Sequence, residues 1–334
     1  MGRTSPRGKS MPLVSIVMPV YNSAATLKES LEAIFRSDYP SYELIVVDDA
    51  SSDDSVKIAR SFPCKIIEKK KNTGAGDTRN IGAKAAKGQI LLFTDSDCIM
   101  KKDTLSKLVK SFAKAVDVVA GTYSKKTLRG SSIYESYHSL LCHYNYSRSD
   151  VALFGTFCAA IKRETFEKLG GFDKSIGGAT VEDLKFQYGL QKRHIPYVIS
   201  MDAQVFHKSR ATFSSLIRGY YTRARYAAGL LFTLKRIKPE KSGYILNHET
   251  IASYGFVSLA ALFLLLSFFK LSFILPLILS LMAFIMSRRK LYQSAPKNVP
   301  LLKIIGISMV CDLAVVVGGA IGTVQHSIKG GKRR

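Results

Sequence analysis

The chain has 334 residues, of which 47% are apolar, and this length suits one large domain with an appendage rather than one small domain. A formal net charge of +24 predicts an anionic partner, such as a phosphorylated molecule, a phospholipid surface or nucleic acid. The five cysteines form no CxxC pair, so neither a zinc motif nor a dithiol redox motif is predicted.

Residues 1–11 are predicted to be a flexible basic tail. From residue 13 onward, short apolar runs alternate with amphipathic stretches. We expect strands at 13–18, 43–47, 65–67, 89–94 and 116–120, and helices at 24–35, 53–61, 77–87 and 103–115. This alternation predicts an α/β domain with a mostly parallel sheet flanked by helices, in which ligands bind outside the carboxyl ends of the strands.

The pattern loosens after residue 123, although the α/β domain is expected to extend over residues 12–210. The remaining elements expected in it are helices at 131–148 and 181–193 and strands at 156–161 and 201–206. Residues 211–245 form a basic, aromatic amphipathic segment around an expected helix at 212–234. Such a segment is typical of a helix lying in the membrane interface.

Residues 246–334 are predicted to be a transmembrane region with about three apolar helices. The apolar stretches are 251–269, 271–287 and 301–324, although the last contains Lys303 and Asp312. The basic run at 288–290 favours the cytoplasmic side, which places the α/β domain on that side of a multi-pass protein of the cell membrane. Because the basic residues border apolar spans, nucleic-acid binding is not expected.

Acidic residues cluster where the predicted strands end. Asp48 and Asp49 follow the second strand, where they can accept hydrogen bonds from a nucleobase and a ribose; a helix N-cap cluster is the structural alternative. The glycine-rich loop at 72–82 enters a helix, so its amides can face an anion, and Arg79 adds a cation. Asp95 and Asp97 follow the fourth strand and offer oxygen ligands to Mg²⁺ or Mn²⁺.

Six segments make this chain resemble the family 2 glycosyltransferases with the GT-A fold: PVYN at 19–22, VVDDASSDDS at 46–55, NTGAGDTRNIG at 72–82, FTDSD at 93–97, GGFD at 170–173 and ED at 182–183. The resemblance implies catalysis by Asp183 with Glu182, and metal binding by Asp97 with Asp95 and His207. It implies nucleotide-sugar binding by Pro19, Val20, Tyr21, Asp48, Asp49, Asn72, Gly74, Arg79, Asn80, Asp95 and Ser96. Arg218, Arg223 and Arg225 are candidate contacts to donor or lipid phosphates.

The resemblance therefore implies an inverting, metal-dependent transfer from a nucleotide-sugar. With the basic and apolar C-terminal region, the expected acceptor is lipid-linked or a glycolipid at the cytoplasmic membrane face. Two alternatives stay open: a polyprenyl-phosphate acceptor, and a non-catalytic membrane protein that keeps the fold. The QxxRW motif of processive synthases is absent, which favours transfer of single sugars. A sugar-nucleotide pyrophosphorylase would need a GGxGTR-like loop where PVYN stands.

Overall fold

A computed structural model describes residues 11–128, 130–147, 154–173, 182–208, 212–234, 248–296 and 299–331. The basic tail and the loop at 177–180 that precedes the ED motif lie outside these residues. The chain divides into two compact units. One, the sheet unit, comprises residues 1–124 and 152–209, and the other, the helical unit, comprises residues 125–151 and 210–334. The described residues of 125–147, which the sequence placed inside the α/β domain, thus group with the C-terminal helices.

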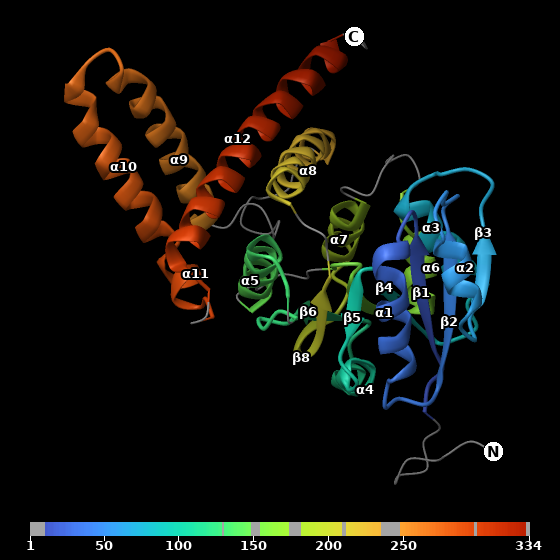
Figure 1. Cartoon of the computed structure of the whole chain (residues 1–334). Coiled ribbons are helices and arrows are strands. Elements are labelled where there is room, and N and C mark those ends of the chain that lie inside the picture. Colours follow the sequence, from blue (N-terminus) through green and yellow to red (C-terminus); the bar gives the residue numbers. More distant parts are fainter. Residues whose placement is uncertain are drawn as a thin grey trace. The chain divides into compact units, whose positions relative to one another are not determined.

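The sheet unit is built on one mixed eight-stranded sheet with the order β3-β2-β1-β4-β7-β6-β8-β5 (Figure 1). Its strands are β1 (Val14–Val20), β2 (Tyr42–Asp48), β3 (Lys65–Glu68), β4 (Ile90–Thr94), β5 (Cys98–Met100), β6 (Val118–Tyr123), β7 (Cys158–Lys162) and β8 (Tyr197–His207). Strands β3, β2, β1 and β4 are parallel, as expected from the sequence. Strand β7 runs antiparallel to β4 and β6, and β5 runs antiparallel to β8. The carboxyl ends of β1, β2, β3 and β4 therefore share one edge.

Helices α1 (Ala24–Phe35), α2 (Ser55–Arg60), α3 (Ala75–Ala85), α4 (Thr104–Ser111), α6 (Arg163–Leu169) and α7 (Glu182–Lys192) belong to the sheet unit. Phe93 of β4 lies at the centre of the core, where its ring packs edge-on against Phe172 at 5.2 Å and contacts Phe166 at the same distance. Each such buried aromatic contributes roughly 1.5–3 kcal/mol by leaving water. This packing fixes the strand from which the DxD segment emerges.

Most of the predicted elements occur within a few residues of their expected bounds, and α1 occupies the expected 24–35. In the sheet unit, two elements were not predicted, β5 and α6. Strand β5 has only three residues, and its partner strand is about 100 residues away, with Cys98 opposite His207. An element this short carries no periodicity of its own, so only its pairing defines it.

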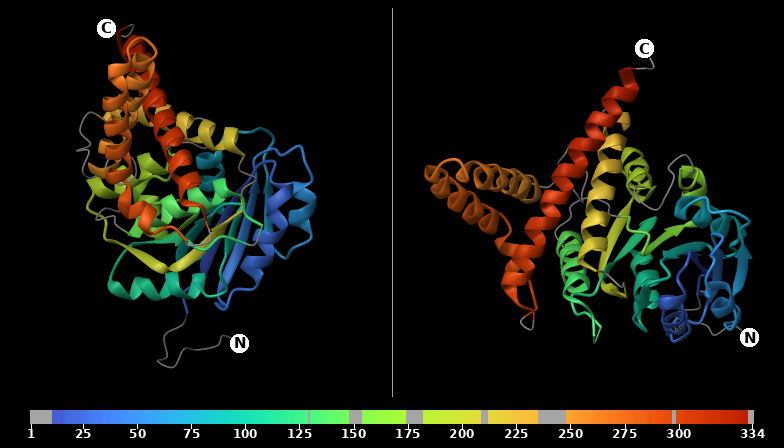
Figure 2. Two further views of the ribbon diagram at one scale, coloured as in Figure 1. Left: turned by 60° about the vertical axis from the view of Figure 1, so that its left-hand side comes forward. Right: turned by 45° about the horizontal axis from the view of Figure 1, so that its top comes forward.

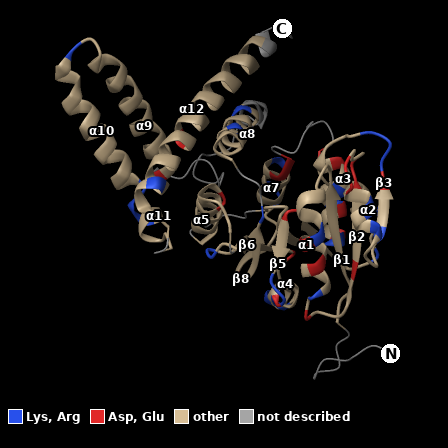
Figure 3. Ribbon diagram, viewed as in Figure 1, with Lys and Arg blue, Asp and Glu red and all other residues tan. Residues whose placement is uncertain are grey.

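The helical unit contains α5 (Ile133–Ser147), α8 (Phe213–Leu234), α9 (His248–Ser267), α10 (Ile274–Ser287), α11 (Arg289–Gln293) and α12 (Leu301–Gly331). Helices α9 and α10 form a hairpin, which all three views show side by side (Figure 2). Lys270 is the basic residue at its tip, and α10 itself carries no charge (Figure 3). Around the tip, Phe268 and Phe269 are more than 80% exposed. These apolar surfaces are suited to lipid rather than water.

Two helical segments, Glu249–Ser267 and Leu301–Ile328, are long and apolar enough to cross a bilayer. The stretch expected as the second of three spans divides into a 3-10 turn, Leu271–Phe273, and α10, which has 14 residues. At 1.5 Å per residue α10 is about 21 Å long, shorter than the hydrocarbon core of about 30 Å. The number of spans therefore stays a prediction.

Candidate active site

A cleft opens at the shared carboxyl edge of β1, β2 and β4. It encloses about 900 Å³, counting the part that is open to solvent. Ten residues predicted to bind the nucleotide-sugar or the metal line it: Pro19, Val20, Tyr21, Asp49, Asn72, Gly74, Arg79, Asp95, Ser96 and Asp97. The parallel register of β1 with β2 and β4 places the ends of these strands side by side. Segments far apart in the chain thus line one site.

Asp49 organises the glycine-rich loop at this edge. Its Oδ1 accepts a hydrogen bond from the backbone N–H of Thr73, and its Oδ2 accepts one from that of Gly74, both at 2.9 Å. The ammonium of Lys69 lies 2.6 Å from Oδ1 of Asp49. Asp49 is 3% exposed, so its charge is neutralised mainly by these protein groups. The carboxylate fixes the loop that borders the cleft.

Arg79 of α3 connects two acids from distant segments. Its Nη2 lies 2.6 Å from Oδ1 of Asp95, and its Nη1 lies 2.9 Å from Oε1 of Glu182. Burial by itself would lower the pKa of the guanidinium, but the two carboxylates outweigh burial and raise it. Arg79 therefore stays charged and joins the DxD turn to the ED segment.

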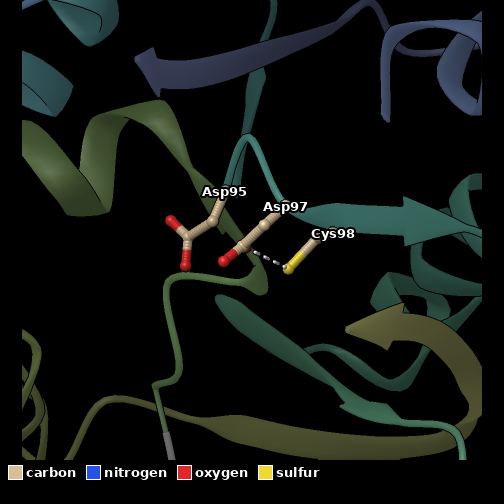
Figure 4. A group of neighbouring side chains, drawn as sticks. All are labelled: Asp95, Asp97 and Cys98. Atoms are coloured by element: carbon tan, nitrogen blue, oxygen red, sulfur yellow. Dashed lines mark hydrogen bonds between the residues drawn. The ribbon is translucent and has the colours of Figure 1, made fainter. Parts of the chain in front are cut away.

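The DxD turn holds a group of potential metal ligands between β4 and β5. One ligand atom from each of Asp95, Asp97 and Cys98 lies within 4.8 Å of the others, and the two carboxylates stand side by side (Figure 4). The thiol of Cys98 donates to Oδ1 of Asp97 at 3.6 Å. Nε2 of His207 lies 3.3 Å from Oδ2 of Asp97. The two carboxylates are donors that fit Mg²⁺ or Mn²⁺, and the imidazole stands beside one of them.

The two DxD carboxyls have different proton affinities. Burial raises the pKa of Asp95, and the charge of Asp97 adds to this effect, while Arg79 opposes it. Burial also acts to raise the pKa of Asp97, but the neighbouring His207 outweighs it, and the pKa falls below its ordinary value. The surroundings therefore shift the pKa values of the two acids in opposite directions.

The ED segment begins α7. Glu182 is 4% exposed, and its Oε2 is buried without a hydrogen-bond partner among the described residues. Its Oε1 accepts a hydrogen bond from Nη1 of Arg79. Asp183 is partly exposed, and its Oδ1 accepts the backbone N–H of Leu184 at 2.8 Å. Asp183 is therefore the more accessible acid of the pair, while Glu182 is engaged in positioning Arg79.

Two residues predicted to bind the nucleotide-sugar do not line the cleft. Oδ2 of Asp48 accepts the backbone N–H of Ser51 at 3.0 Å, which supports the turn after β2. The amide of Asn80 donates to the carbonyl of Phe172 at 2.8 Å and accepts its N–H at 2.9 Å. Asn80 therefore holds the GGFD segment, at a place where Gly171 has a φ of +72° and leaves no room for a Cβ beside the amide.

The sequence did not single out Lys69, although its ammonium also lies 3.4 Å from Asp77 and its side chain is only 8% exposed. Lys69 directly follows β3, so the strand-end rule applied to the acids could have found it. Because Lys69 is the first of three consecutive lysines at 69–71, nothing in the sequence distinguishes it from its neighbours. The cleft is also lined by Ser23, Ala75 and Thr78.

The three predicted phosphate contacts, Arg218, Arg223 and Arg225, lie on α8 in the helical unit. Nε of Arg225 donates to Oε1 of Gln325 in α12 at 2.9 Å. Arg223 lines a separate pocket of the same unit. Their contact with phosphate stays a prediction.

Residues 15–170 match the model of the glycosyl transferase family 2. These residues belong to that family. The match covers the strands and loops that build the cleft, including the DxD turn. The match ends before the ED segment at 182–183, so the roles that the resemblance implies for Glu182 and Asp183 stay predictions.

Known proteins resemble this family 2 domain over parts of their length. Glycosyltransferase GlyG of Streptococcus pneumoniae is 34% identical over 117 residues, which are 33% of this chain and 39% of that protein. Glycosyltransferase AglE of Haloferax volcanii is 29% identical over 178 residues, which are 50% of this chain and 58% of that protein. These two alignments thus span less than two thirds of the length of either relative.

Solved structures with low sequence identity share the fold. The mannosyltransferase PcManGT from Pyrobaculum calidifontis, in complex with GDP-Man and Mn²⁺, superposes with a TM-score of 0.60 at 21% identity. The superposition covers 97% of this chain and 90% of that one. Residues 1–349 of S. aureus TarS superpose with a TM-score of 0.52 at 20% identity, covering 95% and 91%. The sheet unit has the GT-A-like fold expected from the motifs.

Proposed function

We propose that this protein transfers a sugar from a nucleotide-sugar donor to an acceptor at a membrane surface, in a metal-dependent reaction that inverts the anomeric centre. The observation that carries the proposal is the meeting of Asp49, Arg79 and the DxD acids Asp95 and Asp97 in one cleft of a family 2 domain. An anionic diphosphate needs such a combination of a cation site and fixed loop amides.

The donor class follows from the same cleft. The structural relatives include one with GDP-Man and one, TarS 1-349, with UDP-GlcNAc. Asn72 and Gly74 border the space where a nucleotide would lie, and Tyr21 is 52% exposed at its rim. An exposed ring at a binding site can stack on a base. Uridine and guanosine donors are therefore both to be tested.

In the proposed mechanism, Asp183 takes the proton of the acceptor hydroxyl, and the acceptor oxygen attacks the anomeric carbon. The bond from that carbon to the diphosphate breaks on the opposite side, so one displacement inverts the centre. Mg²⁺ or Mn²⁺, held by Asp95 and Asp97 with His207, supplies positive charge at the diphosphate when it is bound. Arg79 holds Asp95 in place.

The membrane part of the proposal comes from the helical unit. Two helices are long and apolar enough to span, and the basic residues 288–290 favour the cytoplasmic side for that end of α10. The acceptor is therefore proposed to be lipid-linked or a glycolipid, with the catalytic unit on the cytoplasmic face. Labelled sugar appearing on a polyprenyl monophosphate would select that acceptor.

The test is release of nucleotide diphosphate from UDP- and GDP-sugars by the full chain in detergent, with Mn²⁺ or with a chelator. We expect metal-stimulated release that Asp183→Asn lowers by about 100-fold or more. Asp202→Asn is the matched control, because Asp202 is an exposed acid in β8, outside the cleft lining. Equal activity of all three proteins would contradict the role of Asp183, and no metal-stimulated release from any donor would favour a non-catalytic protein that keeps the fold.

A further inference from the structure

In the α9–α10 hairpin, both arms are close to the length that crosses a bilayer. Helix α9 has 20 residues and is about 30 Å long, and α10 with the preceding 3-10 turn is about 27 Å long. Between Glu249 and Arg288 the sequence contains one charged residue, Lys270 at the tip. The two ends of the hairpin lie together, because Nζ of Lys290 is 3.4 Å from Oε1 of Glu249. The hairpin is therefore suited to cross a bilayer and return to the side from which it started.

Helix α12 packs along α8, and their backbones are in direct contact. A Cβ on Gly318 would lie 2.3 Å from the backbone oxygen of Tyr221, and a Cβ on Gly322 would lie 2.2 Å from that of Arg225. A step of four residues along α12 thus matches a step of four along α8 in the same direction. The two helices run parallel, so a membrane that takes up this part of α12 also takes up α8.

Helix α8 is unsuited to the interior of a bilayer. It contains no acidic residue, and its basic residues include Arg218 and Arg225. An arginine at the centre of a spanning helix costs about 2.5–3.5 kcal/mol on insertion scales. A basic residue beside anionic headgroups is instead stabilised by about 1 kcal/mol. Helix α12, which is packed on α8, therefore belongs at the level of the headgroups.

The first part of α12 is used in packing within the helical unit. Ile304, Ile307 and Cys311 belong to an apolar cluster with residues of α5, α8 and α11. Nη2 of Arg288, which ends α10, lies 2.8 Å from Oδ1 of Asp312, so Asp312 is level with the base of the hairpin. From Asp312 to Ile328, where the apolar segment ends, α12 is only about 24 Å long. The hydrocarbon core of a bilayer is about 30 Å thick.

Beyond Asp312, the exposed apolar side chains of α12 lie on one face. They are spaced by four, three and four residues, and they are Val317, Ile321, Val324 and Ile328. Gly318 and Gly322 lie on the face toward α8, and the exposed residues Gln325 and Ser327 are polar. An apolar stripe along one face is typical of a helix that lies in the plane of the membrane interface.

The basic residues beside these helices agree with that placement. Four of the residues 235–241, which follow α8, are basic, and so are four of the residues 329–334 at the end of α12. Basic residues that flank membrane segments favour the cytoplasmic side. If α8 and α12 crossed the membrane, both groups would lie on the side opposite to the basic run 288–290. If only the hairpin crosses, all three groups lie on the cytoplasmic side.

We infer that, among the described helices, only α9 and α10 cross the membrane, while the α8–α12 pair lies in the headgroup region of the cytoplasmic leaflet. The apolar stripe of α12 faces the acyl chains, and the arginines of α8 lie at the level of the lipid phosphates. The helical unit then has two spans instead of the three that the sequence predicts. The inference rests on the membrane part of the proposed function and on no step of the transfer reaction.

Depth in the bilayer tests this inference, because the chain contains no tryptophan and a single introduced one reports its own position. The full chain is placed in vesicles of phosphatidylglycerol and phosphatidylcholine, and its fluorescence is quenched by lipids brominated near the headgroup or near the chain end. Val317→Trp is expected to be quenched about twofold more by the shallow bromines, because an interfacial helix is buried only about 5–10 Å.

Leu259→Trp is the matched control for depth. Leu259 lies near the middle of α9 and is 43% exposed, whereas Val317 is 44% exposed. We expect Leu259→Trp to be quenched more strongly by the deep bromines. If Val317→Trp were quenched as deeply as Leu259→Trp, α12 would span the membrane, and the inference would be overturned.

Labelling of cysteines in cells that produce the full chain tests the sides of the membrane. Cys64→Ser provides the background, because Cys64 is partly exposed and the other four cysteines are buried. A maleimide that does not cross membranes is expected to label Lys270→Cys in intact cells. It should label Ser327→Cys, at an exposed position of α12, only after the cells are permeabilised.

Labelling of Ser327→Cys in intact cells, or no labelling of it under either condition, would overturn the inference. If Lys270→Cys were labelled only after permeabilisation, the hairpin would not cross, and the membrane part of the proposed function would fail as well. Melting temperatures verify that each variant is folded. Release of nucleotide diphosphate in detergent is measured separately, so the transfer reaction and the membrane topology can fail independently.

Discussion

Nη1 of Arg79 lies 2.9 Å from Oε1 of Glu182, although 103 residues separate them in the chain. The side chains are 4% and 5% exposed, so water contributes little to balancing either charge. The same guanidinium binds Asp95, so Arg79 joins the start of α7 to the DxD turn. Four predictions follow from this relationship and from others in the sheet unit.

Arg79→Gln is expected to destabilise the protein by about 3 kcal/mol, because it leaves Glu182 buried without its cation. Turnover should fall by about 100-fold as Asp95 loses its support. The melting temperature and the rate of diphosphate release measure the two effects. Arg60→Gln is the control, since the Arg60–Glu68 pair is exposed and contributes at most about 1 kcal/mol. If Arg79→Gln were as stable as Arg60→Gln, this would contradict the role of Arg79 in joining Glu182 to Asp95.

His207→Gln is expected to raise the Mn²⁺ concentration for half-maximal activity by about tenfold, because the imidazole lies 3.3 Å from Asp97 and supports or completes the cation site. Asp97→Asn should abolish metal stimulation. Mn²⁺ titration followed by electron paramagnetic resonance measures binding without turnover. Asp54→Asn, which changes an exposed acid before α2, should leave the Mn²⁺ dependence unchanged. An unaltered titration in His207→Gln would exclude His207 from the site.

Gly82→Ala is expected to lower the free energy of unfolding by about 1–3 kcal/mol. A Cβ at this position of α3 would lie 2.4 Å from Cγ1 of Val17 and 3.1 Å from Cγ2 of Val47, so the helix would be forced away from the sheet. Gly189→Ala in α7 is the matched control, because its nearest neighbour would be 3.9 Å away. The free energy of unfolding of Gly189→Ala should be unchanged or higher by up to about 1 kcal/mol, because alanine has the higher helix propensity. Thermal melting of both variants decides the comparison.

Asp117→Asn is expected to reduce stability near neutral pH but not in acid. Burial acts to raise the pKa of Asp117, but hydrogen bonds from Lys162 at 2.7 Å and Thr165 at 2.9 Å outweigh burial and lower it. A carboxyl with a lowered folded-state pKa stabilises the protein above its unfolded pKa of about 3.9, and this contribution disappears as the pH falls through the folded pKa. The difference, at most about 1 kcal/mol for a partly exposed group, should therefore vanish in melting curves taken at decreasing pH. If the stability difference between Asp117→Asn and the unmodified protein stayed constant as the pH falls, the substitution would have removed packing rather than charge.

Much of the catalytic cleft could be predicted because it depends on strand ends. Asp49, Asp95 and Asp97 each follow a strand that its apolar run identifies, and parallel strands bring those ends to one edge. Asn80 shows the limit of this reasoning. It stands in a family motif, yet its amide is used by the backbone of Phe172, 92 residues away. No local pattern encodes such a partner.

The α/β alternation, the glycosyltransferase motifs and the apolar C-terminal region could all be recognised without a structure, because hydrophobic periodicity and turn residues act over a few positions. Three contacts became visible only in the folded chain. Strand β5 pairs with β8 and so brings His207 beside Asp97, Arg79 joins Asp95 to Glu182, and Lys69 neutralises Asp49. These contacts depend on strand order and on the burial of charge. Both are properties of the packed chain, since a buried charge takes whichever partner the fold places within reach.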